Sequence, residues 1–341
     1  MSSVQPALSY HAASVYAEDI ATLNEYEWLN DNILTLWIEY ITHELLEKAN
    51  QDFVSSSSSS SSFSLASQIL IMHPSAVQLS LLLSPIDYQE AMENLHIPNY
   101  NVIICPINNS TNPYEIQSGS HWSLLVILHI HHHQQENNNK KDDEYIFIGI
   151  DSMVSLPVSS SSSSSLWSPI TISANTSSLQ LYTLKNHTSY ANNGNIQATL
   201  RFIKYMETIL GIPSTNNGTS FSSNNNSTTS LSGVYISSSF RNVFGYLPCL
   251  IQENSYDCGI HTLYTIERLC QQICSQISRL SKIYLNNNSI NLEDWLSSLQ
   301  LDTLFLSSSS KANNVTPLQE IYRYRKRIQQ WIKEEQQKKY L

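Results

Sequence analysis

Residues 250–261 read Leu-Ile-Gln-Glu-Asn-Ser-Tyr-Asp-Cys-Gly-Ile-His. The apolar run from Leu247 to Ile251 indicates the end of a strand, and a polar turn follows it. From Cys258 to Ile277, apolar side chains recur with helical spacing, which predicts a helix that begins at or near Cys258. Free N–H groups and the dipole at a helix N-terminus favour a thiolate. The cysteine is therefore a candidate nucleophile, and a buried structural cysteine is the alternative.

Two polar side chains near this cysteine are candidates for assisting it. Gln252 lies six residues earlier, across the turn, where its amide could donate to the oxyanion formed when a thiolate attacks a carbonyl. His261 lies three residues later and could approach the sulfur, but it has no obvious carboxylate partner. We therefore expect the base to be another histidine.

Composition narrows the class of protein. The 341 residues carry a formal net charge of −10 and are 41% hydrophobic, enough for a core in one large or two small domains. No run of 18 apolar residues predicts a membrane helix, and the first residues lack the features of a signal peptide. The five cysteines have no framework spacing, which indicates free thiols in the cytoplasm or the nucleus. The acidic balance argues against nucleic-acid binding.

Segments rich in serine and asparagine interrupt the chain. They lie near residues 55–62, 131–144, 153–195, 213–239 and 307–314. We interpret them as insertions, because such sequences cannot bury apolar area. Without them roughly 250 residues remain, which predicts a single α+β domain over residues 1–341. The three histidines at 131–133 cannot all face one ion from a regular element, so we assign no metal site and expect no cofactor.

Three compact apolar runs predict buried strands, and two of them carry a polar residue with catalytic potential. The runs lie within residues 101–107, 119–128 and 145–152. His121 stands at the start of the second apolar run and Asp151 near the end of the third. Alone, each is typical of a structural role. With Cys258 they supply the base, the orienting carboxylate and the nucleophile that thiol catalysis needs.

Further elements, mostly helices, are predicted before and after these strands in the chain. The predicted elements are short helices within 63–97, a helix over 196–210, a short helix near Trp295, a helix over 317–338 and a possible short strand over 179–184. In the last helix, the basic residues Arg323, Arg325, Lys326 and Arg327 are expected to form a solvated face.

An N-terminal block adds candidate binding residues. Asn30 or Asp31 can cap a helix whose apolar face includes Ile33, Leu34 and Trp37. Trp28 precedes this cap, where it is either a hydrophobic staple or an aromatic residue with a surface function.

These residues resemble the Ulp-type cysteine proteases, which cleave ubiquitin-like modifiers. The resemblance covers about residues 8–277 and lies in four motifs: Trp28-Leu29-Asn30-Asp31, His121-Trp122-Ser123-Leu124, Asp151-Ser152, and Gln252 with Asp257-Cys258-Gly259. The phrases at 119–126 and 252–259 are most similar to the deneddylase branch, whose members act on the Nedd modifier.

The resemblance implies a papain-like α+β fold with a central mixed sheet flanked by helices. It implies that Cys258 is the nucleophile, His121 the base and Asp151 the residue that orients this base. Gln252 would be the oxyanion donor. Trp28 and Trp122 would be the lids of a tunnel that admits only the Gly-Gly tail of a modifier. Asn30 and Asp31 would lie near that tail.

The implied partners are a ubiquitin-like modifier, of Nedd type or else of SUMO type, and its conjugates such as cullin-type proteins; we expect a monomer.

Two alternatives of another class stay open. A His-Asp-Cys acetyltransferase on a related fold would leave the two tryptophans without an evident role. A silent modifier-binding protein would not need an intact triad. The chain departs from the family in its longer spacings, in Ile260-His261 and in residues 153–195, which do not align.

Overall fold

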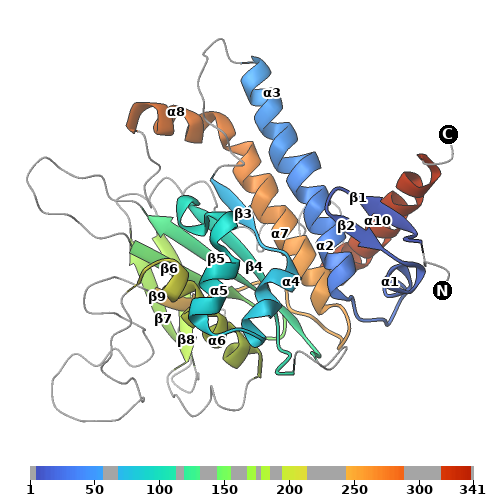
Figure 1. The fold of residues 1–341 in the computed structure, drawn as a ribbon, viewed down its shortest axis with the longest axis horizontal. Coiled ribbons are helices and arrows are strands. Elements are labelled where there is room, and N and C mark those ends of the chain that lie inside the picture. Colours follow the sequence, from blue (N-terminus) through green and yellow to red (C-terminus); the bar gives the residue numbers. More distant parts are fainter. Residues whose placement is uncertain are drawn as a thin grey trace, which may run out of the picture.

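The computed structural model describes residues 5–56, 68–112, 119–130, 144–154, 167–173, 178–184, 194–212, 243–287 and 316–338. In these ranges seven strands form one mixed sheet in the order β3-β4-β5-β6-β9-β8-β7 (Figure 1). The strands are β3 (Ile69–Ile71), β4 (Val102–Asn108), β5 (Trp122–Ile130), β6 (Glu144–Ile150), β7 (Trp167–Ser173), β8 (Ser178–Leu184) and β9 (Val243–Tyr246). The pairs β3–β4 and β6–β9 are parallel, and the other pairs are antiparallel.

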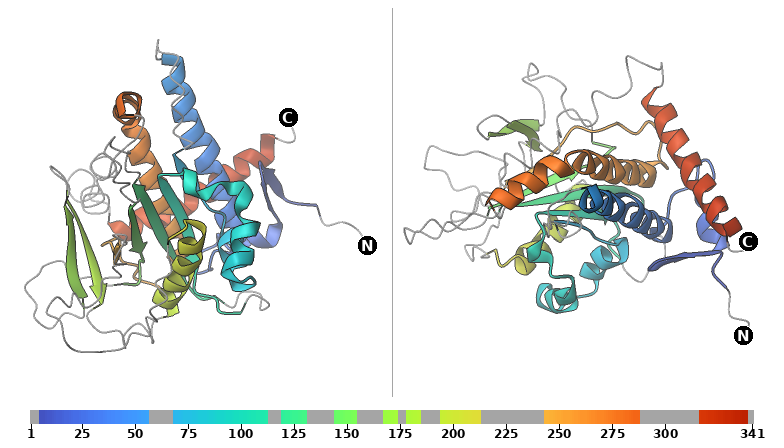
Figure 2. Two further views of the ribbon diagram at one scale, coloured as in Figure 1. Left: turned by 60° about the vertical axis from the view of Figure 1, so that its left-hand side comes forward. Right: turned by 90° about the horizontal axis from the view of Figure 1, so that it is seen from above.

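The central strands are apolar along most of their length because both faces of the sheet are covered. Alternate residues of one strand face opposite cores: Leu124 and Val126 belong to one apolar cluster, and Leu125 and Ile127 to the other. Seen from above, the sheet lies between two helical layers (Figure 2). The molecule is thus a three-layer α+β structure, as the sequence predicts.

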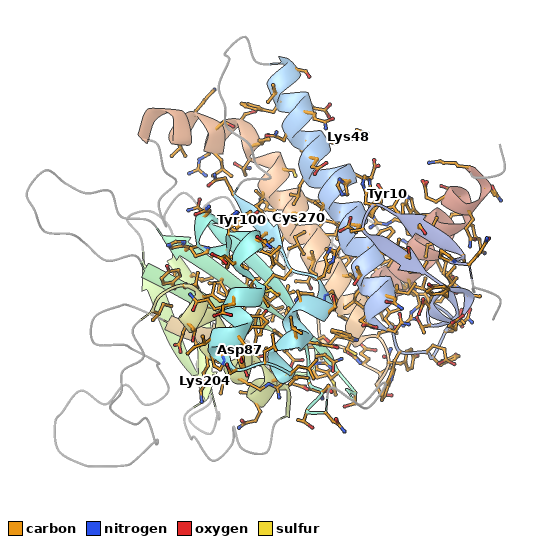
Figure 3. All side chains as sticks on the ribbon, viewed as in Figure 1. Tyr10, Lys48, Asp87, Tyr100, Lys204 and Cys270 are labelled. Carbon is orange, nitrogen blue, oxygen red and sulfur yellow. The ribbon has the colours of Figure 1, made fainter. Side chains whose placement is uncertain are left out.

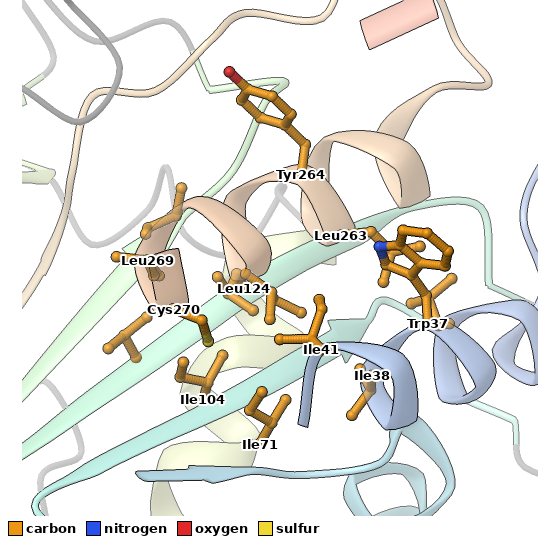
Figure 4. Packing of buried hydrophobic residues seen from close by; sticks show 14 of the residues in the cluster. Trp37, Ile38, Ile41, Ile71, Ile104, Leu124, Leu263, Tyr264, Leu269 and Cys270 are labelled. Atoms are coloured by element: carbon orange, nitrogen blue, oxygen red, sulfur yellow. The ribbon is translucent and has the colours of Figure 1, made fainter. Parts of the chain in front are cut away.

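One layer is built on two long helical segments. The first consists of α2 (Asp31–Tyr40), a π-helical segment η1 (Ile41–Glu47) and α3 (Lys48–Ser56). The second consists of α7 (Cys258–Ser275) and α8 (Ile277–Asn287). Figure 4 shows Cys270 of α7 near Ile104 of β4 and Ile41 of η1. This packing anchors α7 to the sheet and so fixes where its first residue lies.

The other layer consists of short helices and one longer helix. They are α4 (Pro74–Gln78), η2 (Leu79–Leu81), α5 (Pro85–Ala91), η3 (Glu93–Leu95), η4 (Ile97–Asn99) and α6 (Gly194–Ile209). Asp87 on α5 and Lys204 on α6 mark this side in Figure 3. Gly211 has a φ of 65°, a conformation that favours glycine, and α6 ends just before it, as expected.

The C-terminal helix α10 (Pro317–Lys338) covers the edge of the molecule next to the N-terminal hairpin of β1 (Leu8–Tyr10) and β2 (Ala13–Val15), which α1 (Ala17–Ala21) follows. Ile321, Ile328 and Ile332 on α10 are fully buried. The expectation that its basic cluster is solvated is wrong for one member: Arg325 is buried and pairs with Asp257. Arg323, Lys326 and Arg327 are exposed as expected, although Arg327 also pairs with the buried Glu267.

Several element boundaries differ from those expected. Residues 63–97 contain the strand β3 as well as short helices. Residues 153–195, interpreted as an insertion, supply β7 and β8 at the sheet edge, and β8 confirms the possible strand over 179–184. The strand before Cys258 ends at Tyr246, so the run from Leu247 to Ile251 is not strand. Pro248 explains this, because proline cannot donate a ladder hydrogen bond.

Several of the serine- and asparagine-rich segments are described by the structure only in part or not at all. The helix α3 extends through Ser56, into the serine run. Other predicted segments lie outside the described residues. They are most of 55–62 and 131–144, all of 213–239 and 307–314, and the helix expected near Trp295. No helix in the described part of the chain is both long and apolar enough to cross a membrane.

Candidate active site

Cys258 is the first residue of α7 and is 2% exposed. The sequence predicts this position. The structure adds a close contact with the N-terminal block, because a Cβ on the next residue, Gly259, would lie 2.8 Å from Cβ of Leu29. Only glycine allows this approach without displacement. The start of α7 therefore lies against the loop that carries Trp28.

His121 and Asp151 meet at the ends of neighbouring strands. His121 directly precedes β5, Asp151 directly follows β6, and β5 pairs with β6 in antiparallel register. His121 Nε2 lies 2.7 Å from Asp151 Oδ1, and both residues are buried. The same oxygen accepts the Met153 backbone N–H at 2.9 Å. His121 Nδ1 makes no hydrogen bond of normal geometry within the described residues, which leaves it available to a thiol.

The electrostatic environment keeps His121 protonated at neutral pH. Burial acts to lower the pKa of this imidazole, but hydrogen bonding and charge interactions with Asp151 and Cys258 outweigh burial and raise the pKa to about 9. The interaction with Cys258 shows that the imidazole and the thiol are neighbours. An imidazolium next to a cysteine at a helix N-terminus is the arrangement that favours a thiolate.

Gln252 is held beside this pair through Ser152, the residue after Asp151. Its backbone N–H donates to the Ser152 carbonyl at 2.8 Å, and its Oε1 accepts from Ser152 Oγ at 3.0 Å. One N–H of its side chain donates to the Asn254 carbonyl. The amide orientation is thus fixed from both ends, and its second N–H is not used in these bonds.

The two tryptophans occupy different environments. Trp122, 5% exposed, donates its indole N–H to the Leu29 carbonyl at 3.0 Å. Trp28 is 45% exposed, while Leu29 fills the buried position before the helix cap. The staple alternative for Trp28 is therefore wrong, since a staple side chain is packed. Leu29, which contacts both Trp122 and Gly259, was not singled out from the sequence.

Asn30 and Asp31 lie at the start of α2. Asn30 Oδ1 accepts the Ile33 backbone N–H at 3.1 Å, which makes Asn30 the helix cap, and its Nδ2 donates to Asp19 Oδ1 at 2.6 Å. Asp31 is the first helical residue and is partly buried. They follow Trp28 by two and three residues and so belong to the same segment as this candidate binding residue.

His261 is buried one turn after Cys258, and its pKa is lowered to about 4. Burial is the main cause and the nearby His121 adds to it, against an opposing effect of Asp257. A neutral imidazole that does not gain a proton above about pH 4 is a poor general base near neutral pH. His121 is therefore the better candidate.

The other four cysteines are less suited to attack. None forms a disulfide, and burial raises the pKa of Cys105 and Cys270 far above the usual range. Burial also raises the pKa of Cys249 to about 12 and that of Cys274 to about 11. In the described ranges, no three His, Cys, Asp or Glu side chains are grouped so that they could hold a metal ion.

The arrangement defines a class of protein. A cysteine starts a helix packed on a mixed sheet, and a histidine–aspartate pair comes from adjacent strand ends. This is the layout of papain-like cysteine proteases.

Sequence comparison finds similar proteins over part of the chain. No protein-family model matches the chain. It is 28% identical over 123 residues to the probable sentrin-specific protease 8 of Dictyostelium discoideum, covering 36% of this chain and 45% of that protein. It is also 28% identical over 122 residues to human sentrin-specific protease 8, covering 36% and 49%. The chain is thus similar to sentrin-specific proteases over about a third of its own length, and the match spans about half the length of these relatives.

Solved structures were also compared. The crystal structure of a de-sumoylating protease is 13% identical, with a TM-score of 0.46, and the comparison covers 96% of this chain and 88% of that one. A structure of the SUMO protease Ulp1, with its catalytic cysteine oxidised to a sulfinic acid, is 14% identical, with a TM-score of 0.39 and coverage of 98% and 89%.

Proposed function

We propose that the protein is a cysteine protease that cleaves after the C-terminal Gly-Gly of a ubiquitin-like modifier, with the Nedd modifier as the preferred substrate. The observation that carries this proposal is the buried His121–Asp151 pair, 2.7 Å apart, next to Cys258 at the start of α7. The raised pKa of His121, about 9, supplies a protonated imidazole at neutral pH that can donate to the leaving group.

Each catalytic step then has a residue. The Cys258 thiolate attacks the carbonyl carbon of the last modifier glycine, and the C=O electron pair moves to oxygen. The His121 imidazolium donates its proton to the leaving amine, which departs and leaves a thioester on Cys258. Water, deprotonated by the now neutral His121, attacks this thioester and releases the modifier carboxylate and the thiol. Asp151 holds Nε2 throughout, so that Nδ1 stays directed at the reacting atoms.

Gln252 and the start of α7 would stabilise the oxyanion. The side chain of Gln252 is oriented by Ser152 and by the Asn254 carbonyl, which leaves one N–H for the substrate oxygen. A donor that is oriented before the reaction costs no reorganisation at the transition state, and losing one such donor costs on the order of a hundredfold in kcat.

The substrate tail would pass between Trp28 and Trp122. Trp122 is fixed by its bond to Leu29, and the exposed indole of Trp28 can close over an extended glycine pair. Asn30 and Asp31, two and three residues after Trp28, would lie near the modifier tail. The preference for Nedd rests on the phrases at 119–126 and 252–259, with SUMO as the alternative. Conjugates such as cullin-type proteins would be the targets, in the cytoplasm or nucleus, where five free cysteines are stable.

A panel of modifiers carrying a C-terminal electrophile tests this proposal. The wild-type protein should form a covalent adduct with the Nedd probe faster than with SUMO or ubiquitin probes, and mass spectrometry should locate it on Cys258. Cys258→Ala should form no adduct, while Cys249→Ala should react like the wild type. A rapid adduct in Cys258→Ala would refute the nucleophile, and faster reaction with SUMO would refute the preference.

The same proteins separate the other classes. Transfer of label from acetyl-coenzyme A to a protein acceptor would indicate an acetyltransferase. Tight modifier binding without adduct or cleavage would indicate a silent binding protein. The two tryptophans and the complete His121–Asp151–Cys258 set favour the protease.

A further inference from the structure

Arg325 of α10 is the most extensively bonded buried cation in the described part of the chain. The residue is 1% exposed. Nε and Nη2 donate to Asp257 Oδ1 at 3.2 and 2.7 Å. Nη1 donates to the carbonyls of Thr22 and Asn24 at 3.1 and 3.0 Å, and Nη2 also donates to the Glu27 carbonyl at 3.1 Å. The planar guanidinium thus joins two segments that are far apart in sequence.

One of these segments leads directly into Cys258. Asp257 is the residue before α7, and its carbonyl accepts the His261 N–H at 2.9 Å in the first helical turn. Its carboxylate makes no capping hydrogen bond but instead pairs with Arg325 and accepts from Asn254 at 2.8 Å. Arg325 therefore holds the junction before Cys258 and neutralises a carboxylate that would otherwise oppose a thiolate there.

The other segment leads into the tryptophan loop. The carbonyls of Thr22, Asn24 and Glu27 belong to the stretch that ends at Trp28 and Leu29. This stretch contacts α7 through Leu29 and Gly259. Because Arg325 binds both segments, it sets how far one wall of the proposed tunnel lies from the sulfur.

We propose that Arg325 is a positioning residue that fixes the Trp28 loop relative to the start of α7. The proposal rests on the proposed function for its effect on turnover, but its structural part does not. Docking of α10 has other support, from the buried isoleucines and from the Arg327 pair with Glu267, which lies further along α7. The five hydrogen bonds of Arg325, by contrast, go to the two segments that lead into Cys258 and into Trp28.

The test compares Arg325→Lys with the matched control Arg323→Lys, at an exposed position two residues earlier on the same helix. Lysine keeps the charge for Asp257 but has no fork that can reach both segments. Amide hydrogen exchange, measured without substrate, should become faster in residues 20–29 and in residues 253–262 of Arg325→Lys, and in neither segment of Arg323→Lys. Cleavage of a fluorogenic modifier substrate by Arg325→Lys should show kcat reduced by about tenfold or more, with a smaller change in KM.

A second variant keeps the test decisive if Arg325→Lys does not fold. Asp257→Asn leaves the three carbonyl bonds of Arg325 in place, so exchange should rise in 253–262 and stay unchanged in 20–29. For Arg325→Lys, amide exchange that becomes faster only within α10, or an unchanged kcat in the folded variant, would overturn the proposal. Unchanged exchange at residues 253–262 of Asp257→Asn would also overturn it. If the wild type cleaves no modifier, the proposed function fails, while the exchange data still decide whether Arg325 bridges the segments.

Discussion

His121 is oriented by the bond from Nε2 to Asp151, which leaves Nδ1 for Cys258. Two opposing effects set its charge: burial favours the neutral ring, whereas Asp151 and Cys258 favour the imidazolium. The second effect is larger. Removing one partner should therefore change the pH range in which the site is active, and not only its rate.

The first prediction concerns the alkaline limit of activity. Because the active pair needs protonated His121, kcat/KM should fall as pH rises through about 9. In Asp151→Asn the favourable charge is lost while burial remains, so the limit should move to lower pH. A pH–rate profile from pH 5.5 to 10 measures this shift. An alkaline limit at the same pH in both proteins would show that Asp151 does not control His121.

The second prediction concerns stability in acid. His261 has a folded-state pKa of about 4 against an ordinary value of 6.5, so its folded form is neutral. Its contribution is fully present above pH 6.5 and is lost as pH falls through about 4. Between these limits the wild type should lose about 3 kcal/mol of unfolding free energy that His261→Gln does not lose. Urea unfolding of both proteins at pH 7 and pH 4 gives this difference. Parallel losses in the two proteins would contradict it.

Sequence reasoning placed His121, Asp151 and Cys258 correctly at the ends of their elements, because apolar runs that stop at polar residues mark such ends. It did not find Arg325. On an amphipathic helix a basic residue looks solvated, and its partner Asp257 lies 68 residues earlier in the chain. Only tertiary packing shows that this position faces inward.

The loop before α2, the start of β5 and the start of α7 form one junction around Leu29. Its carbonyl accepts the Trp122 indole N–H, and its side chain lies against Gly259. The junction explains how residues from three separate elements share one site. Each element was expected from its own sequence, but their meeting at Leu29 was not.

The third prediction tests this junction. Trp122→Phe keeps an aromatic ring in the core but removes the N–H, so the buried Leu29 carbonyl loses its donor. The unfolding free energy should fall by about 1–3 kcal/mol. Modifier cleavage should fall more than the alkylation rate of Cys258 by iodoacetamide, since the loop moves and the sulfur does not. Equal losses of both activities would place Trp122 in general packing instead.

The sheet was predicted only in part. The missed strand β3 has three residues, too few to show a period, and it pairs only with β4. The missed strand β7 lies at the sheet edge in a serine- and threonine-rich region, where apolar content is a weak guide, whereas its neighbour β8 matches the possible strand over 179–184. The central strands were found because both of their faces are buried.

At the scale of the whole molecule, α10 connects the C-terminal part of the chain to its N-terminal part. This helix lies against the N-terminal hairpin: Gln336 donates to the Ala7 carbonyl, and Trp331 packs edge-on against Tyr10. Figure 1 shows β1, β2 and α10 on the same side of the molecule. The sequence predicts one domain over residues 1–341, and a helix that packs against the N-terminal hairpin is compatible with that prediction. The family resemblance stops near residue 277, so it gave no information about α10.

The fourth prediction follows from this packing of α10. A chain that stops after residue 315 loses Ile321, Ile328 and Ile332, all fully buried. At about 1.5–3 kcal/mol each, they contribute roughly 5–9 kcal/mol, similar to the whole stability of a typical domain. The truncated chain should show no cooperative thermal transition by circular dichroism, while a chain that stops after Lys338 should unfold like the full protein. A cooperative transition in the shorter chain would show that α10 is dispensable.

Arg325 also has a consequence for the order of events during protein synthesis. It bonds to Thr22, which is 303 residues earlier in the chain. When Cys258, His121 and Asp151 have been synthesised, the residue that ties the start of α7 to the tryptophan loop has not. The nascent chain therefore carries all three groups before the Trp28 loop is fixed relative to Cys258, and we expect full cleavage activity only after Arg325 has been synthesised and has left the ribosome.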